Sequence, residues 1–414
     1  MLKQFVNTGT LARFILRRDR IRISVWIISL VLFTMLIAAV LPDLYTTSEE
    51  RQVMAETMRN PAITVMLGPG YGLDNYTDGA MMAHFMLVFT ALTVGIMSIL
   101  LTIRYTREDE EEGRIEMIRS LPVGPLSTLT ATILIMVIVN IILALLTGLG
   151  LYSLGFESMD LYGSLLYGGS LGATGIIFAA ITGLFAQLSS NTRSAIGYSF
   201  SFLILSYIVR GIGDVENEVL SLISPLGLIL RTEVYVNNYW WPVFVTLGLS
   251  ISVFVLALYL NSIRDLGSGF IAAKAGRRRA SRFLLSPLGL SLRLQRTTII
   301  SWTLGMLILG MSYGSILGDL EGFIDSSGMI QQMIPESGGY TLTERFVTML
   351  MTILSILGTI PVLLYVLKLR SEEKKNRTEN LLTRAVSRNN LLFSYTILAL
   401  VSRFSVLFFF SSLL

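Results

Sequence analysis

The side chains that most often do chemistry in proteins are scarce in this sequence. It holds one histidine, His84, and no cysteine, which leaves too few ligands for a zinc site of the usual kind. A Ser-His-Asp arrangement would have to use His84, and no acid lies inside a hydrophobic segment near it. No GxxxxGKS or GxxxxGKT motif occurs, so the chain carries no P-loop for ATP. The pattern favours a histidine without chemistry and a function other than catalysis.

Charged side chains are concentrated instead in one short stretch, TREDEEEGRIEMIRSLPVGP, at residues 106–125. Five consecutive acids are followed by alternating arginine and glutamate. Glu110 and Arg114 are four residues apart and would lie on neighbouring turns of a helix. Acids at the start and Arg119 at the end suit the helix dipole, and Pro122 ends the helix. The stretch predicts a short, rigid, charged helix that transmits force to a soluble partner; the alternative is an ordinary solvated hairpin.

The composition predicts the surroundings of this stretch. Of the 414 residues, 53% are hydrophobic and 14% are charged, whereas soluble domains carry roughly 25% charge. The predicted fold is therefore all-α, a polytopic helical membrane protein. About 20 apolar residues cross a bilayer as a helix. Nine segments approach this length: 21–42, 81–103, 128–153, 164–188, 195–212, 242–261, 298–318, 345–367 and 391–412. We interpret the first as a retained helix, because residues 1–20 are too polar for a cleavable signal.

Basic and acidic residues alternate between successive loops. The N-terminus carries six lysines and arginines, and residues 262–297 carry eight with one acid. Residues 43–80 hold six acids and two arginines, and residues 319–344 hold five acids and no base. Because basic loops stay inside, we expect the N-terminus and residues 106–125 in the cytoplasm. Residues 5–18 predict an amphipathic helix in the inner headgroup layer; the alternative is an unstructured basic anchor.

A similar charged stretch with fewer acids, LRSEEKKNRTENLLTRAVSR, occurs at residues 369–388. The two align without gaps at an offset of 263, and the hydrophobic segments that begin at Trp26 and Trp302 align at an offset of 276. The matched charged residues are Arg107 with Arg370, Asp109 with Glu372, Glu110 with Glu373, Arg114 with Arg377, and Glu116 with Glu379. Matches in the same order and with the same topology predict an internal duplication.

The duplication divides the chain into three predicted parts. A first repeat of six spans covers residues 1–261, and a basic cytoplasmic linker covers residues 262–297. The second repeat, residues 298–414, has three spans and is incomplete beside the first. Arg403 falls near the middle of the ninth span, a costly place for an arginine to which the sequence assigns no partner.

Glycines at four-residue spacing predict close packing of some of these helices. They occur in the fourth and seventh segments: Gly168 and Gly172, then Gly310, Gly314 and Gly318. Small residues at this spacing are evidence about structure and carry no information about a substrate.

With these motifs the sequence resembles the permeases of type-2 ATP-binding cassette (ABC) exporters, in the duplicated branch of polyketide-antibiotic exporters. The resemblance covers nearly the whole chain and is carried by LRRDRIRISVW (residues 16–26), REDEEEGRIEMIRSLPV (residues 107–123), residues 369–388 and the pattern of spans. It implies an interfacial helix before the first span, and a coupling helix after the second span that docks on a separate ATPase subunit.

The resemblance also assigns roles to residues. It places Arg107, Glu110, Arg114 and Glu116 in one coupling element, and Arg370, Glu373, Arg377 and Glu379 in the other. These side chains would contact the partner or stabilise the hairpin. The family has short re-entrant helices outside, between the fifth and sixth spans. Residues 218–230, EVLSLISPLGLIL, occupy that place; they are expected to form a hydrophobic external plug or, alternatively, a surface amphipathic helix.

The leading hypothesis is a permease subunit of an ATP-driven exporter in a bacterial-type plasma membrane. Two copies of a separate ATP-binding subunit would bind ATP and magnesium and press on the hairpins. This chain itself is expected to hold no cofactor and no metal. An interior without fixed charges suits hydrophobic or amphipathic cargo, antibiotic or drug-like. No residue is assigned to cargo, and nothing indicates nucleic-acid binding. The alternatives are an ion-coupled secondary multidrug carrier, which usually needs titratable groups within its spans, and a non-transporting membrane scaffold.

Overall fold

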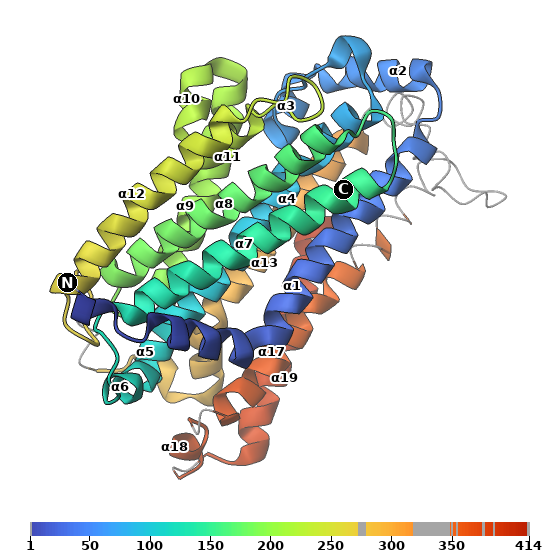
Figure 1. The fold of residues 1–414 in the computed structure, drawn as a ribbon. Helices are drawn as coiled ribbons and strands as arrows, with labels where there is room; N and C mark the ends of the chain where they lie inside the picture. The colour runs from blue at the N-terminus through green and yellow to red at the C-terminus, as the bar shows by residue number, and fades with distance from the viewer. Residues whose placement is uncertain are drawn as a thin grey trace. The chain divides into compact units, whose positions relative to one another are not determined.

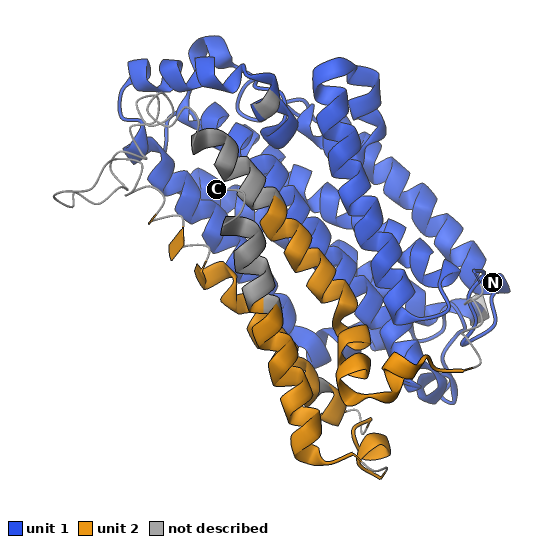
Figure 2. Cartoon of the chain, turned by 180° about the vertical axis from the view of Figure 1, so that it is seen from behind, with its two compact units in different colours: residues 1–274 blue, residues 275–414 orange. Residues whose placement is uncertain are grey.

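The computed structural model describes residues 2–271, 279–317, 348, 351–352, 355–374, 377–383 and 386–411. Across these residues the chain is helical, and its only extended pairing is an isolated bridge between Ser189 and Ile271. The all-α fold predicted from the composition is therefore confirmed. Two compact units, Met1–Lys274 and Ala275–Leu414, divide the chain (Figure 2). Their boundary falls within residues 262–297, where the sequence predicts a linker.

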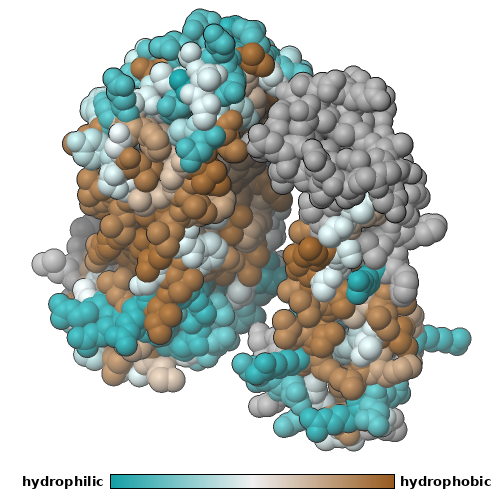
Figure 3. Space-filling view, turned by 90° about the vertical axis from the view of Figure 1, so that its right-hand side faces the viewer, coloured by the Kyte–Doolittle hydropathy of each residue, from teal (hydrophilic) through white to brown (hydrophobic). Residues whose placement is uncertain are grey.

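Six helices of the first unit are long and apolar enough to cross a membrane. They are α1 (Thr8–Leu44), α4 (Asp78–Ile103), α7 (Ser127–Ser153), α8 (Leu161–Leu188), α9 (Thr192–Glu216) and α12 (Trp241–Ile263). Each contains one of the first six segments predicted from hydropathy. Figure 3 shows the resulting surface, with a brown hydrophobic belt between teal hydrophilic ends. The chain is accordingly a multi-pass membrane protein.

The first of these helices is bent. Asp19 departs from helical geometry, with φ −110° and ψ 17°, and the part of α1 before it runs across the ends of other helices (Figure 1). We call residues 8–22 the N-terminal segment. Leu11, Ala12 and Ile15 on its inner side are buried in the hydrophobic core. The structure thus has a helix, from Thr8 onward, where the sequence leaves an unstructured anchor as the alternative.

Helix α8 lies at the centre of the first unit, packed against α4, α7 and α12 (Figure 1). Glycines permit the close approach to α7. A Cβ added at Gly168 would lie 2.0 Å from the carbonyl oxygen of Ala144, and one at Gly172 would lie 3.1 Å from that of Asn140. Sequence spacing singles out both glycines. It misses Gly175, where a Cβ would lie 1.7 Å from the side-chain oxygen of Asn140.

Replacing Gly168 by alanine is expected to destabilise the first unit, because the added methyl group would meet the α7 backbone. Overpacking of this kind costs about 1–3 kcal/mol. Gly197 in α9 provides a matched control, since a Cβ there meets nothing within 4 Å and alanine favours a helix. Thermal unfolding of the detergent-purified chain should show a lower melting temperature for Gly168→Ala and no decrease for Gly197→Ala. Equal melting temperatures for the two variants would contradict the packing.

Short helices cover the end of the first unit that lies opposite the N-terminal segment (Figure 1). They are α2 (Ser48–Met58), α3 (Pro61–Leu67), η2 (Leu73–Asn75), α10 (Glu218–Ile223) and α11 (Pro225–Leu230). Residues 218–230 therefore form two helices. In α11, Leu226, Leu228 and Ile229 are buried, whereas Val219 and Ile223 of α10 are exposed, so the second of the two helices is inserted and the first lies at the surface.

Arg210 is a charged residue inside the fifth predicted segment, and its contacts accommodate the charge. Its side chain is fully buried and donates to the carbonyl oxygens of Val65 at 2.8 Å and Met66 at 3.2 Å, at the C-terminal end of α3. It also pairs with Asp214 at 3.3 Å. Carbonyl groups at a helix end lack partners within the helix, and a guanidinium satisfies them. Arg210 thereby joins α9 to α3.

The described helices of the second unit are η4 (Arg282–Leu285), α13 (Pro287–Leu317), α17 (Thr359–Lys374), α18 (Glu379–Leu382) and α19 (Arg388–Ser411). Helix α19 packs against α13 and α17. The described parts of the seventh and ninth predicted segments lie in α13 and α19, and the described end of the eighth lies in α17. Gly310 and Gly314 lie in α13, whereas Gly318 and residues 319–344 lie outside the described residues. Arg403 is half-buried in α19.

Candidate functional site

The charged stretch continues α4 beyond its hydrophobic part. After Ile103 the chain widens into a π-helical turn, Arg104–Glu108, followed by α5 (Asp109–Glu111). Gly113 then adopts a left-handed conformation with φ 73°, and α6 (Arg114–Arg119) follows it. The prediction of one charged helix is therefore wrong, because glycine permits the positive φ at which the helix breaks. We call residues 104–126 the first charged hairpin.

Arg107 and Glu110 lie on the buried side of this hairpin. Their side chains are 3.0 Å apart. The Glu110 carboxylate also binds the guanidinium of Arg264 at 2.8 Å and accepts a hydrogen bond from the backbone N–H of Gly267 at 2.7 Å. Arg264 directly follows α12, so these contacts fix the hairpin to the end of the sixth span. Both predicted residues thus lie in contacts between the hairpin and the residues that follow α12.

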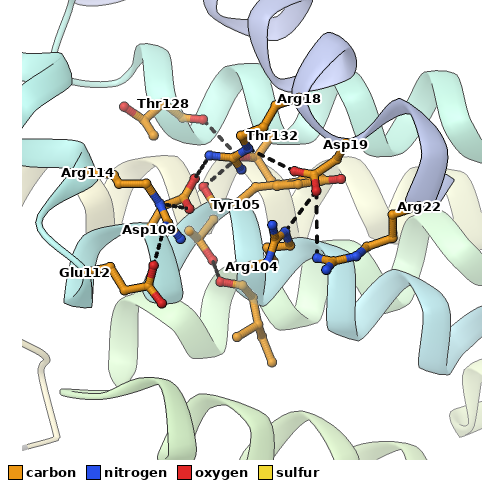
Figure 4. Close-up of polar contacts among 12 residues, drawn as sticks. Arg18, Asp19, Arg22, Arg104, Tyr105, Asp109, Glu112, Arg114, Thr128 and Thr132 are labelled. Carbon is orange, nitrogen blue, oxygen red and sulfur yellow. Dashed lines mark hydrogen bonds and ion pairs between the residues drawn. The ribbon is translucent and has the colours of Figure 1, made fainter. Parts of the chain in front are cut away.

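A second ionic cluster joins the hairpin to the kink in α1 (Figure 4). The carboxylate of Asp109 binds Arg114 at 2.7 Å and Arg18 at 2.9 Å. Arg18 also binds Asp19 at 2.9 Å, and Asp19 binds Arg104 at 3.1 Å. Both carboxylates are almost fully buried. A buried carboxylate is costly without its cations, so these pairs hold the N-terminal segment against the hairpin.

The site residues predicted from the sequence do not include Arg18, Asp19 or Arg104. One signal was present: Asp19 is the only acid among the first 42 residues, and five arginines surround it. A lone acid in a basic segment is best explained by a structural partner. The cation that reaches it from the hairpin, Arg104, is 85 residues away in the sequence, and no local pattern connects the two.

The extreme N-terminus holds the chain where it leaves the hairpin. A 3-10 helix, η1 (Leu2–Phe5), precedes α1. The backbone N–H of Gly124 donates to the carbonyl oxygen of Val6 at 3.1 Å. The side-chain amide of Asn7 donates to the carbonyl oxygen of Pro122 at 2.7 Å. The hairpin is therefore fixed at its exit as well as at its entry.

Helix α6 has an outward face that these contacts leave free. Its buried side is formed by Ile115. On the other side Glu116 is exposed, Met117 is 71% exposed, and Leu121, just after the helix, is 59% exposed. We call Glu116, Met117, Ser120 and Leu121 the hairpin tip. An acid beside two exposed apolar side chains is a surface suited to binding another protein.

The second unit repeats one contact of the first. Glu372 is buried and binds Arg377 at 3.3 Å and Lys368 at 3.2 Å. Arg377 follows Glu372 by five residues, as Arg114 follows Asp109, and the two pairs coincide at the offset of 263. We call each pair an acid–arginine clasp, and the described residues among 368–388 the second charged hairpin.

The other predicted residues of the second charged hairpin lie at its surface. Arg370, Glu373 and Glu379 are all exposed. Glu373 binds Arg388 at 2.9 Å. Arg370 and Glu373 differ in this respect from Arg107 and Glu110, whose side chains are almost fully covered. The clasp is the ion pair that both hairpins share among the described residues.

His84 has structural partners. One ring nitrogen lies 2.9 Å from the hydroxyl of Tyr76, and the other lies 3.1 Å from the carbonyl oxygen of Gly68. These contacts join α4 to the loop that follows α3. Within the described ranges, no three histidine or acidic side chains are grouped as a metal site requires.

The described part of the chain is helical, with six candidate spans in the first unit and charged hairpins in both units, and it defines a polytopic membrane protein. The chain matches the family described as the C-terminal domain of the multidrug efflux system permease Rv1217c, over residues 9–260 and 284–414. It is 32% identical over 399 residues to the multidrug efflux system permease protein Rv1217c of Mycobacterium tuberculosis (strain ATCC 25618 / H37Rv), covering 96% of this chain and 72% of that protein. The chain therefore belongs to this family of multidrug efflux permeases.

Replacing Asp109 by asparagine removes the charge that Arg18 and Arg114 share. Breaking a buried ion pair costs about 3–5 kcal/mol, so we expect a lower melting temperature and faster native-state trypsin cleavage in the hairpin. Glu112→Gln is the matched control: it removes a carboxylate that also binds Arg114 but is 44% exposed, where the cost is about 1 kcal/mol or less. If both variants behave alike, Asp109 does not hold the hairpin.

Proposed function

We propose that this chain is the membrane subunit of an ATP-driven multidrug exporter whose ATP-binding subunit is a separate protein, present in two copies. The name of the related mycobacterial protein supports the efflux of several drugs. The sequence has no P-loop motif, which favours an external source of energy. One observation carries the proposal: two charged hairpins, one in each unit, are built on the same acid–arginine clasp.

The contacts of the first charged hairpin suit it to transmit a push. From α6, Arg114 leads through Asp109 to Arg18 at the kink of α1. On the other side, Glu110 leads to Arg264 at the end of α12. Because buried ion pairs are costly to break, a displaced hairpin would carry the kink of α1 and the end of α12 with it. In the proposed cycle, ATP and magnesium act on the partner subunit, and this chain converts the resulting push into helix movement.

The proposed cargo is apolar or amphipathic. The polar side chains buried midway along the described spans of the first unit are neutral, such as Ser98, Asn140 and Thr174. Arg210 and Asp214, near the end of α9, neutralise each other. A charge-free interior suits cargo without a net charge, in agreement with drug-like compounds.

We further propose that the N-terminus and both charged hairpins lie in the cytoplasm, on the basis of the basic residues around them. The chain has no cysteine, so single cysteines can report sidedness. Ser120→Cys at the hairpin tip should react with a membrane-impermeant maleimide only after permeabilisation. Glu157→Cys, exposed in the turn between α7 and α8, should react in intact cells. The reverse pattern would overturn the proposed orientation.

The combined change Glu116→Arg and Met117→Glu alters the hairpin tip without touching the clasp. We expect about ten-fold or greater loss of co-purification with a co-expressed P-loop ATPase from the same cell, since interface anchors contribute about 2 kcal/mol or more. ATP-dependent drug efflux from vesicles should fall in parallel. Glu157→Arg, which reverses an exposed acid elsewhere, is the control and should retain both.

Two results would contradict docking at the hairpin tip. One is unchanged co-purification and efflux in the tip variant with an unaltered melting temperature. The other is efflux that persists without ATP and follows an imposed proton gradient, which would indicate an ion-coupled carrier instead. A tip variant with a lowered melting temperature calls for the single change Glu116→Gln, which should still weaken ATPase binding measurably if the tip is the contact.

A further inference from the structure

The N-terminal segment contains five arginines, and two of them are bound by acids of the chain. Arg18 binds Asp19 and Asp109, both at 2.9 Å. Arg22 lies 3.7 Å from Asp19. The internal ionic cluster therefore accounts for these two arginines and not for the other three.

Arg13, Arg17 and Arg20 take no part in that cluster. All three are exposed, and no carboxylate in the described part of the chain lies within 4 Å of them. Arg13 and Arg17, four residues apart, share one side of the helix before the kink, and Arg20 directly follows the kink at Asp19. We call these three residues the outer arginine stripe. Three neighbouring cations that no acid of the described chain binds form a surface that attracts negatively charged molecules.

A second, apolar strip runs beside the outer arginine stripe. Phe14 follows Arg13 and is 54% exposed, and Ile21 follows Arg20 and is 73% exposed. In a helix, the next residue lies about 100° around the axis, a little over a quarter turn. The N-terminal segment thus has three sides: one packed on the core, one apolar and exposed, and one basic and exposed. A helix at the boundary between lipid headgroups and acyl chains has this arrangement.

We propose that the outer arginine stripe binds the phosphate groups of anionic phospholipids in the leaflet that holds the N-terminus. The proposal rests on the permease architecture and goes beyond the proposed drive by an ATPase. Guanidinium groups form paired, charge-assisted hydrogen bonds with phosphate oxygens. Phe14 and Ile21 would meanwhile contact the acyl chains just below. A lipid surface satisfies the basic and the apolar strip together.

A soluble acidic protein would fit less well. It would leave Phe14 and Ile21 exposed to water, or would have to cover them with an apolar surface inside the headgroup layer. The N-terminal segment also continues directly into the span of α1, which holds it at the edge of the bilayer. Position, charge and apolar contact therefore favour anionic lipid as the occupant.

The test uses the full chain in phosphatidylcholine nanodiscs that contain a trace of photoreactive phosphatidylglycerol or, in parallel, photoreactive phosphatidylcholine. Peptide mass spectrometry measures crosslinks to residues 8–22. We expect phosphatidylglycerol to be strongly preferred, and the preference to weaken at high salt because exposed charges are screened. Each basic residue near an anionic surface strengthens binding about five-fold. The triple change Arg13→Gln, Arg17→Gln and Arg20→Gln should therefore reduce the preference by about ten-fold or more.

Two controls separate charge from fold. The triple change of the same arginines to lysine keeps the charges and should retain most of the preference. Arg59→Gln removes a half-exposed arginine from the opposite end of the first unit and should change nothing. Equal crosslinking by the two lipids, or a preference that survives the glutamine changes at an unaltered melting temperature, would overturn the proposal. No ATPase is present, so failure of the proposed coupling leaves this result unaffected. If the glutamine changes abolished ATPase co-purification while both lipids crosslinked equally, the stripe would be a protein contact.

Discussion

The structure of the first unit depends on the requirement that a carboxylate removed from water must find a cation. Asp19 and Asp109 are both almost fully buried, and Arg18 touches both of them. One carboxylate lies at the kink of the first span and the other at the start of the hairpin after the second. Neither can move far without leaving a buried charge unpaired. The same ion pairs therefore fix both the bend in α1 and the position of the hairpin.

The same requirement joins the hairpin to α12, the last spanning helix of the first unit. Glu110 is held by Arg107 from its own helix and by Arg264 from the end of α12. The hairpin is thus tied to the first and the last spanning helix of the unit, while the glycine-lined contacts of α8 hold the centre. A rigid element fixed at two points on the periphery of a close-packed bundle transmits displacement better than it absorbs it. That property, rather than any one residue, makes the hairpin suitable for passing a displacement on to the spanning helices.

The sequence predicts those structural features that depend on residues close together along the chain. Hydrophobic length located the six spans of the first unit, and four-residue spacing singled out Gly168 and Gly172. Contacts between distant residues were beyond it: Arg18 meets Asp109 across 91 positions, and Arg264 meets Glu110 across 154. Charge pattern alone also cannot distinguish a buried carboxylate from a solvated one. It predicted a continuous helix through Gly113, because the acids and arginines on either side suit one.

The two hairpins are alike in their clasps and differ in what surrounds them. At the offset of 276, Asp19 corresponds to Gln295, a neutral side chain that is buried and has no hydrogen-bond partner among the described residues. At the offset of 263, Arg104 corresponds to Leu367. The second hairpin therefore keeps the clasp but lacks the counterparts of the charges that bind the first hairpin to the kink of α1. Among the described residues, the duplication therefore preserves the internal fastening of the hairpin and not the ionic link to the span that precedes it.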